Sequence, residues 1–161
     1  MTIVRLRSRR PSHGQALVEF ALVIPLILLL FMGVFDFGRY IYAYNAVSNA
    51  AREGARTAIV NQYPSDIVDR AAAQATALGI STASSSCPIS GSSGVCVQFL
   101  TSNLSATCST LDIGCVAVVT VKDTVSPITP IIGSIIGSIA VSSTSQQPIE
   151  SVCSTSGCPV P

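Results

Sequence analysis

The six cysteines are the most reactive side chains in this sequence of 161 residues, and all of them follow a long hydrophobic segment. An even number of cysteines on one side of such a segment is typical of disulfides in an oxidising compartment. Zinc binding and dithiol redox catalysis are disfavoured because no C-x2-C pair is present. Local spacing favours three short bridges, although the sequence cannot select one pairing. The candidates are Cys87 with Cys96, Cys108 with Cys115, and Cys153 with Cys158.

Groups for acid–base catalysis are scarce in this sequence. Its one histidine, His13, precedes the hydrophobic segment, so the region beyond that segment has no imidazole for a general base or a catalytic triad. We find no nucleophile–base pair, phosphate-binding loop or base-stacking patch, and the net charge is only +1. We therefore expect a protein that is not an enzyme, that has no cofactor and no metal site, and that binds no nucleic acid.

The hydrophobic segment has the length of a membrane-spanning helix. Residues 16–35 are apolar except for Glu19, and a helix of about 20 residues spans roughly 30 Å, the thickness of the hydrocarbon core. The segment is too long for the apolar part of a cleaved secretory signal, and no A-x-A-like site follows it. Arginines precede it and none lies within it, which predicts a cytoplasmic N-terminus and an extracytoplasmic C-terminal part. The preceding arginines are Arg5, Arg7, Arg9 and Arg10.

Two residues within this segment are unusual for a simple anchor. Glu19 places a carboxylate near the inner end of the span, where a charge is costly, so an intramembrane partner is expected. Pro25 removes a helical hydrogen bond and is expected to kink or locally melt the helix. At the outer end, Asp36, Arg39 and Tyr40 are expected at the membrane interface.

A short motif at the start of the hydrophobic segment carries a family resemblance. Gly14 to Phe20 read GQALVEF, which has the form G-x-x-x-x-E-[FY], after a basic leader and before an apolar helix. This arrangement resembles the processing site of type IV pilins of the Flp/Tad branch. Residues 14–58 strongly resemble the TadE-like family of type IVc pilus-assembly pseudopilins, or minor pilins. Residues 116–145 are more loosely similar to the C-terminal strand-and-turn region of that family.

The resemblance implies processing and assembly. It implies that a prepilin peptidase cleaves between Gly14 and Gln15, and that Glu19 then pairs with the N-terminal ammonium of a neighbouring subunit or with its own terminus. Phe20 and Pro25 belong to the same processing and subunit-contact segment. The implied partners are the peptidase, other pilin or pseudopilin subunits, the inner-membrane Tad machinery and the lipid bilayer. Many pilins have an aromatic residue where this sequence has Gln15, which leaves N-methylation open.

The elements that position these residues predict a pilin-like α+β fold. We expect a basic leader (1–14), a transmembrane helix (15–36), its extracytoplasmic continuation (37–62) and a small disulfide-linked α+β domain (63–161). That domain should contain a second helix, a short antiparallel sheet, Ser/Gly-rich loops and a flexible C-terminal tail. The protein is expected in the inner (cytoplasmic) membrane as a single-pass protein, and the resemblance adds an extracellular pilus as a further location.

Local patterns refine this outline. A row of small residues that includes Ala51, Gly54 and Ala55 either covers the protein's own sheet or forms a seam between subunits. Ser65 is predicted to cap the second helix, which should end before Gly79.

The C-terminal half predicts strands and one further apolar element. Val-rich residues 95–100 and 115–121 predict strands. Residues 127–139 have isoleucines at helical spacing and no charge, which indicates a short amphipathic helix against the core or the outer membrane surface. A second membrane span is the alternative for this segment.

Three functions fit these observations. The first is a cleaved TadE-like minor pilin that enters or primes a thin pilus. The second is a scaffold of the Tad secretion machine that stays in the membrane. The third is a generic single-pass protein whose disulfide-linked domain binds an extracellular ligand.

Overall fold

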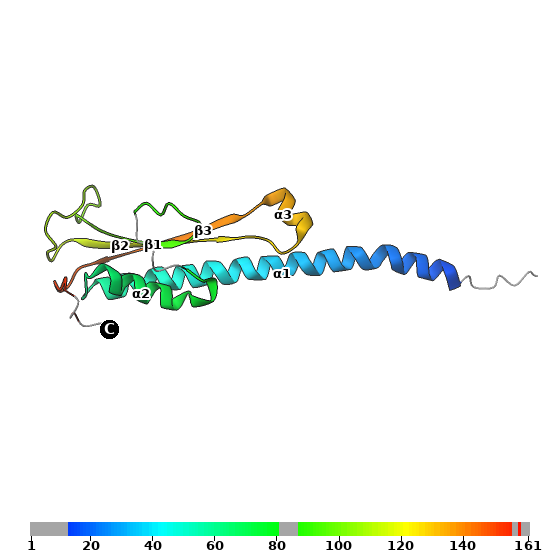
Figure 1. Ribbon diagram of the computed structural model, residues 1–161, viewed down its shortest axis with the longest axis horizontal. Helices are drawn as coiled ribbons and strands as arrows, with labels where there is room; N and C mark the ends of the chain where they lie inside the picture. The colour runs from blue at the N-terminus through cyan, green and yellow to red at the C-terminus, as the bar shows by residue number, and fades with distance from the viewer. Residues whose placement is uncertain (1–12, 81–86, 156–157, 159–161) are drawn as a thin grey trace, which may run out of the picture.

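The computed structural model describes residues 13–80, 87–155 and 158, and it has the predicted α+β architecture (Figure 1). Residues 1–12 of the predicted leader, residues 81–86 of a predicted loop, and residues 156–157 and 159–161 of the predicted C-terminal tail lie outside the described residues. The helices are α1 (His13–Ala58), α2 (Pro64–Gln74), a short 3-10 helix (Thr76–Leu78) and α3 (Pro130–Ile136). The strands β1 (Gly94–Leu100), β2 (Val116–Val125) and β3 (Ile139–Pro148) form one antiparallel sheet in the order β1-β2-β3.

Helix α1 has two halves with different surroundings. Its first part, residues 14–35, is largely apolar and almost wholly exposed; we call it the exposed half of α1. From Ala43 onward, one side of the helix is buried. Figure 1 shows this second half alongside the sheet and α2, whereas the exposed half extends beyond them. The helix continues through Pro25 without interruption, so the local melting predicted at this proline is absent.

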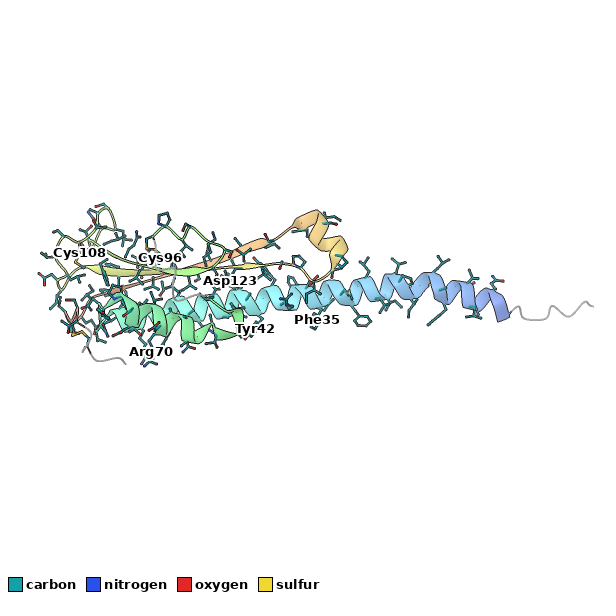
Figure 2. The ribbon with its side chains drawn as sticks, viewed as in Figure 1. Phe35, Tyr42, Arg70, Cys96, Cys108 and Asp123 are labelled. Carbon is teal, nitrogen blue, oxygen red and sulfur yellow. A yellow bond between two sulfur atoms is a disulfide. The ribbon has the colours of Figure 1, made fainter. Side chains whose placement is uncertain are left out.

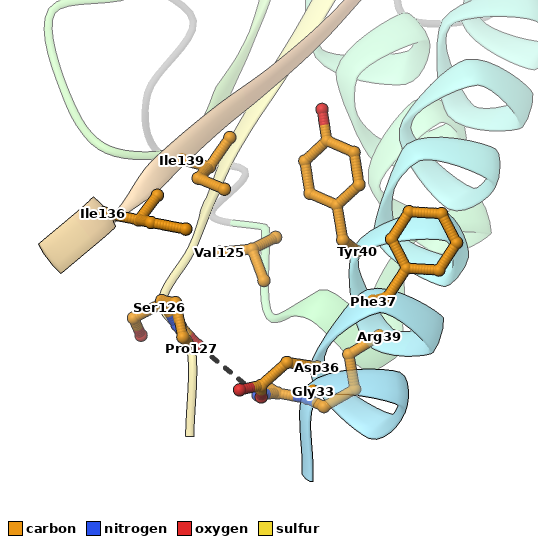
Figure 3. A pocket seen from close by; sticks show the side chains of 10 residues that line it. All are labelled: Gly33, Asp36, Phe37, Arg39, Tyr40, Val125, Ser126, Pro127, Ile136 and Ile139. Atoms are coloured by element: carbon orange, nitrogen blue, oxygen red, sulfur yellow. Dashed lines mark hydrogen bonds between the residues drawn. The ribbon is translucent and has the colours of Figure 1, made fainter. Parts of the chain in front are cut away.

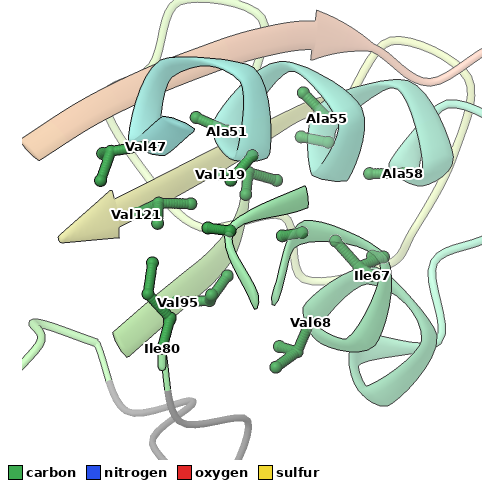
Figure 4. Close-up of a cluster of buried hydrophobic side chains, with 14 of the residues drawn as sticks. Val47, Ala51, Ala55, Ala58, Ile67, Val68, Ile80, Val95, Val119 and Val121 are labelled. Carbon is green, nitrogen blue, oxygen red and sulfur yellow. The ribbon is translucent and has the colours of Figure 1, made fainter. Parts of the chain in front are cut away.

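The core lies between α1, α2 and the inner face of the sheet (Figure 4). Alternate residues of β2 point into this core, and Ala117, Val119 and Val121 are fully buried. The register pairs Val95 with Val121 and Val97 with Val119, so β1 adds its valines to the same face. The helices supply mainly alanines from α1 and larger aliphatic side chains from α2. This two-layer packing fixes the sheet against one side of α1.

Small residues on α1 allow the sheet and α2 to approach it closely. A Cβ atom added to Gly54 would lie 2.9 Å from Cγ1 of Val119 and 3.1 Å from Cβ of Ala71, both shorter than ordinary contacts. Ala51 and Ala55, on the same side of α1, are completely buried. The row of small residues therefore covers the protein's own sheet and second helix. The alternative of a seam between subunits on this face is wrong, because the face is already occupied.

The start of α2 differs from the sequence prediction. Tyr63 occupies the capping position, and Pro64 takes the first helical position, where a missing N–H has no cost. The prediction that Ser65 is the cap is wrong. Instead, Asn61 shapes the turn: its Oδ1 accepts the Tyr63 N–H at 2.8 Å, and its Nδ2 donates to Asp66 Oδ2 at 2.9 Å. After α2 and the 3-10 helix, the chain turns at a glycine in the left-handed conformation, as predicted.

The C-terminal segment adds a strand that the patterns did not predict by themselves. β3 pairs with β2 from Val125↔Ile139 to Val116↔Pro148, and α3 lies at the tip of the β2–β3 hairpin. Since α3 has only seven residues, it is too short to cross a bilayer. Within the described residues, α1 is the one helix long and apolar enough to do so. The alternative of a second span at 127–139 is therefore wrong.

A buried glutamine joins the end of α1 to the C-terminal segment. Gln62, which is 1 % exposed, donates through Nε2 to the carbonyls of Ala58 and Ser151, both at 2.9 Å. Its Oε1 accepts the N–H of Cys153 at 2.7 Å, and the two backbones are also hydrogen-bonded. The chain after β3 is thereby held against the turn that follows α1.

The structure contains three disulfides, and they are the three that local spacing favours. They join Cys87 to Cys96, Cys108 to Cys115, and Cys153 to Cys158. Each bridge closes a short loop at the edge of the sheet or after it, where little apolar core is available. Loop closure of this length stabilises a fold by on the order of 2–3 kcal/mol per bridge.

Candidate functional site

The exposed half of α1 is the first candidate site because the described part of the domain leaves nearly all of its side chains exposed. Its side chains project in all directions around the helix (Figure 2), and large apolar residues such as Leu17 and Phe20 are more than half exposed. A helix that is apolar on every side is stable in a bilayer or against other apolar helices, and not in water. Length and composition make this helix a candidate membrane span.

The predicted processing residues lie at the first turns of this exposed half. Gly14 has open space where a side chain would be, and Glu19 is exposed one turn further along. Gln15 Nε2 lies 3.5 Å from Glu19 Oε1, so positions 15 and 19 share one side of the helix. Phe20 and Pro25 are exposed as well. These residues are accessible together, and the carboxylate at position 19 faces outward from the protein.

Asp36 forms a second candidate site at the end of the exposed half. Its Oδ1 accepts the N–H of Ile128 at 2.9 Å. Its Oδ2 accepts the N–H of Thr129 at 3.1 Å and the hydroxyl of Thr129 at 2.6 Å. Thr129 is the capping residue of α3 and is almost completely buried. The carboxylate of Asp36, on α1, therefore accepts hydrogen bonds from the donors at the start of α3. These bonds fix the hairpin tip to α1. We call this contact the Asp36 clasp.

Arg39 and Tyr40 join the same contact from the next turn of α1. Nη1 of Arg39 donates to the carbonyl of Ser126 at 3.4 Å. Tyr40 is half-buried and packs against the edge of the core. The sequence placed Asp36, Arg39 and Tyr40 together at the membrane interface, and the structure adds that they face residues about 90 positions later in the chain. No sequence pattern marks these partners as contacts of α1. Ser126, Ile128 and Thr129 follow a Val-rich strand, as ordinary loop residues do.

A cavity of about 380 Å³ lies beside the clasp, between α1 and the β2–β3 hairpin (Figure 3). Phe37 and Tyr40 line it from α1, and Val125, Ile136 and Ile139 line it from the hairpin. The lining is almost entirely apolar, with the polar groups of the clasp at one side. Such a cavity accepts an apolar group and offers no arrangement for bond-breaking chemistry.

The remaining predicted residues have structural surroundings. All six cysteines are in disulfides, so none of them provides a thiol. Across the part of the chain that the structure describes, no cluster of three or more histidine, cysteine, aspartate or glutamate side chains could hold a metal ion.

These features define a class of protein: a single long apolar helix of the kind found in single-pass membrane proteins, continued into a small α+β domain. Comparison with known families is consistent with this class and narrows it. Residues 14–56 match the family described as TadE-like protein, which confirms the resemblance over that segment. No curated protein and no solved structure matches the chain.

The matched segment contains both candidate sites on α1. It covers the exposed half, the residues of the Asp36 clasp that lie on α1, and the small residues beneath the sheet, whereas the sheet itself lies outside the match. The match indicates a protein related to the Tad pilus, and that family is not known for enzymatic activity.

Proposed function

We propose that this protein is a minor pilin or pseudopilin that takes part in assembling a Flp/Tad-type pilus after cleavage between Gly14 and Gln15. The observation that carries the proposal is the family match over residues 14–56, which coincides with a helix whose first half is uncovered. In this proposal the N-terminus is cytoplasmic and the domain is extracytoplasmic, because arginines precede the span. The protein acts through contacts with a prepilin peptidase, other subunits and the Tad machinery, and it performs no catalysis.

Glu19 has the central role in the assembly step. A carboxylate in the bilayer costs on the order of 2.5–3.5 kcal/mol at mid-depth and less toward the interface, so it is retained where a cation offsets the cost. Cleavage after Gly14 creates an ammonium at Gln15, one turn from Glu19, as the 3.5 Å contact between these two side chains supports. In the proposed assembly, Glu19 binds the ammonium of a neighbouring subunit and so selects the axial position of the incoming helix.

The first experiment is the intact mass of the mature protein purified from its native membrane. A chain that begins at Gln15, with or without a methyl group, supports processing by a prepilin peptidase. A chain that retains the arginines ahead of Gly14 contradicts the proposal and favours an ordinary signal anchor.

The second experiment separates assembly from processing. We expect Glu19→Gln to stop incorporation into the pilus while leader cleavage continues, as measured by the pilus fraction and by the mass of the membrane form. Glu53→Gln is the matched control because Glu53 lies on the same helix outside the span, and we expect it to assemble normally. A different result would identify a scaffold that stays in the membrane. In that case the wild-type protein would be absent from the pilus fraction, and Glu19→Gln would alter its complexes in the membrane. A silent Glu19→Gln would contradict both roles and favour a generic single-pass binding protein.

A further inference from the structure

We propose that the tip of the β2–β3 hairpin, residues 128–137, is a second membrane contact that lies in the interface of the leaflet from which α1 emerges. The proposal requires that α1 crosses the bilayer, and it does not depend on a role in a pilus. Its occupant is the lipid surface, reached by apolar side chains of the tip. The argument comes from where the tip lies, from what it exposes and from how its backbone is satisfied.

The position of the tip is fixed by the Asp36 clasp. The clasp joins the start of α3 to α1 directly after the exposed half ends. Ile128 and Thr129 also share a shallow apolar hollow with Phe31 and Phe35 of the exposed half. Figure 1 shows α3 at the end of the domain that is nearest to the exposed half. A bilayer that covers α1 up to residue 35 therefore meets the hairpin tip.

The surface of the tip has the chemistry of a membrane contact. Ile135 is 79 % exposed, and Ile128 and Ile136 are more than half exposed. No charged residue occurs between Asp123 and Glu150. Exposed isoleucines on a charge-free segment are unfavourable in water and favourable in the interface. This surface is continuous with that of the span, because Ile128 touches the hollow formed by the exposed half.

Several backbone donors of the tip are already bound within the protein. Asp36 accepts the N–H groups of Ile128 and Thr129, and Pro130 has no N–H. The N–H of Gly133 donates to the carbonyl of Thr129, and that of Gly137 donates to the carbonyl of Gly133. Donors that are already bound do not oppose transfer into the interface.

A tryptophan reporter tests this contact, because the natural chain contains no tryptophan. The full-length variant Ile135→Trp is reconstituted in phosphatidylcholine vesicles at low protein density. We expect its emission to shift to shorter wavelength, and we expect brominated phosphatidylcholine to quench most of it. Ile113→Trp is the matched control, since Ile113 is also 70 % exposed but lies in the loop before β2. We expect neither the shift nor the quenching there.

Each alternative has its own signature in this experiment. A blue-shifted emission without quenching by brominated lipid means that protein covers the tip, and it overturns the proposal. If the shift also depends on protein density, the cover is a second copy of the chain. Emission at the wavelength of the Ile113→Trp control shows that the tip is in water, and it overturns the proposal too. Quenching should not change with salt or with phosphatidylglycerol content, because the tip carries no charge; a strong dependence would contradict an apolar contact.

Discussion

Replacing Gly54 by alanine tests how closely the sheet and α2 approach α1. In an exposed helix this change stabilises by about 1 kcal/mol, because alanine has the better helix propensity. At Gly54 the new Cβ would lie 2.9 Å from Val119 Cγ1 and 3.1 Å from Ala71 Cβ. Neither neighbour can yield without a shift of the backbone, since Val119 is β-branched and fully buried and the Ala71 Cβ is attached directly to α2.

Overpacking of this kind costs about 1–3 kcal/mol. The steric cost therefore equals or exceeds the gain in propensity, and we expect Gly54→Ala to be neutral to destabilising. Gly38→Ala is the matched control on the same helix, because a Cβ atom there meets nothing within 4 Å. We expect the control to be neutral or stabilising. The two variants should differ by about 1–3 kcal/mol in the free energy of unfolding.

Thermal unfolding of the full-length protein in detergent, followed by the near-ultraviolet circular dichroism of its tyrosines, measures this difference. For a chain of 161 residues, 1 kcal/mol corresponds to a change of about 2–4 °C in Tm. Equal Tm values for the two variants would refute the close approach at Gly54. A larger loss for Gly54→Leu than for Gly54→Ala would support it further.

Two further predictions concern the C-terminal half. Gln62→Ala should lower the free energy of unfolding by about 2–4 kcal/mol, because it leaves buried partners such as the Cys153 N–H and the Ser151 carbonyl unpaired. The control is Gln146→Ala, at an exposed position of β3, which should change Tm little in the same thermal unfolding assay. Replacing Cys108 and Cys115 together by alanine should lower stability by on the order of 2–3 kcal/mol through the loss of loop closure, as measured by denaturant unfolding. An unchanged midpoint would show that this bridge does not constrain the unfolded chain.

The sequence predicts those elements of this fold whose pattern is local. The apolar run and its motif predict α1, and valine-rich segments predict β1 and β2 because such residues suit a half-buried pleated surface. β3 has no such pattern: Ser143 and Ser145 occupy its inner positions, opposite Val121 and Val119. Pairing with β2 makes this segment a strand, and pairing is a property of the whole fold.

The candidate site follows the same division. The sequence indicates Asp36 as a residue at the membrane exit, but its three hydrogen bonds go to residues 92 and 93 positions away. No single-sequence pattern reports such a contact. The small residues around Gly54 likewise fit two interpretations until the position of the sheet is known, because close approach by a neighbouring subunit and by the protein's own sheet requires the same residues.

The Asp36 clasp and the Gln62 contact hold the domain at two places near opposite ends of the second half of α1. The first contact is at Asp36 and the second reaches the carbonyl of Ala58. These two positions lie roughly 30 Å apart along the helix axis. Two attachments so far apart prevent the domain from swivelling about the point where the helix leaves the membrane. Helix α1 and the domain therefore move as one rigid body. A rotation of the exposed half about the helix axis turns the outer surface of the domain by the same angle. The packing of the exposed half then decides which side of the sheet faces outward.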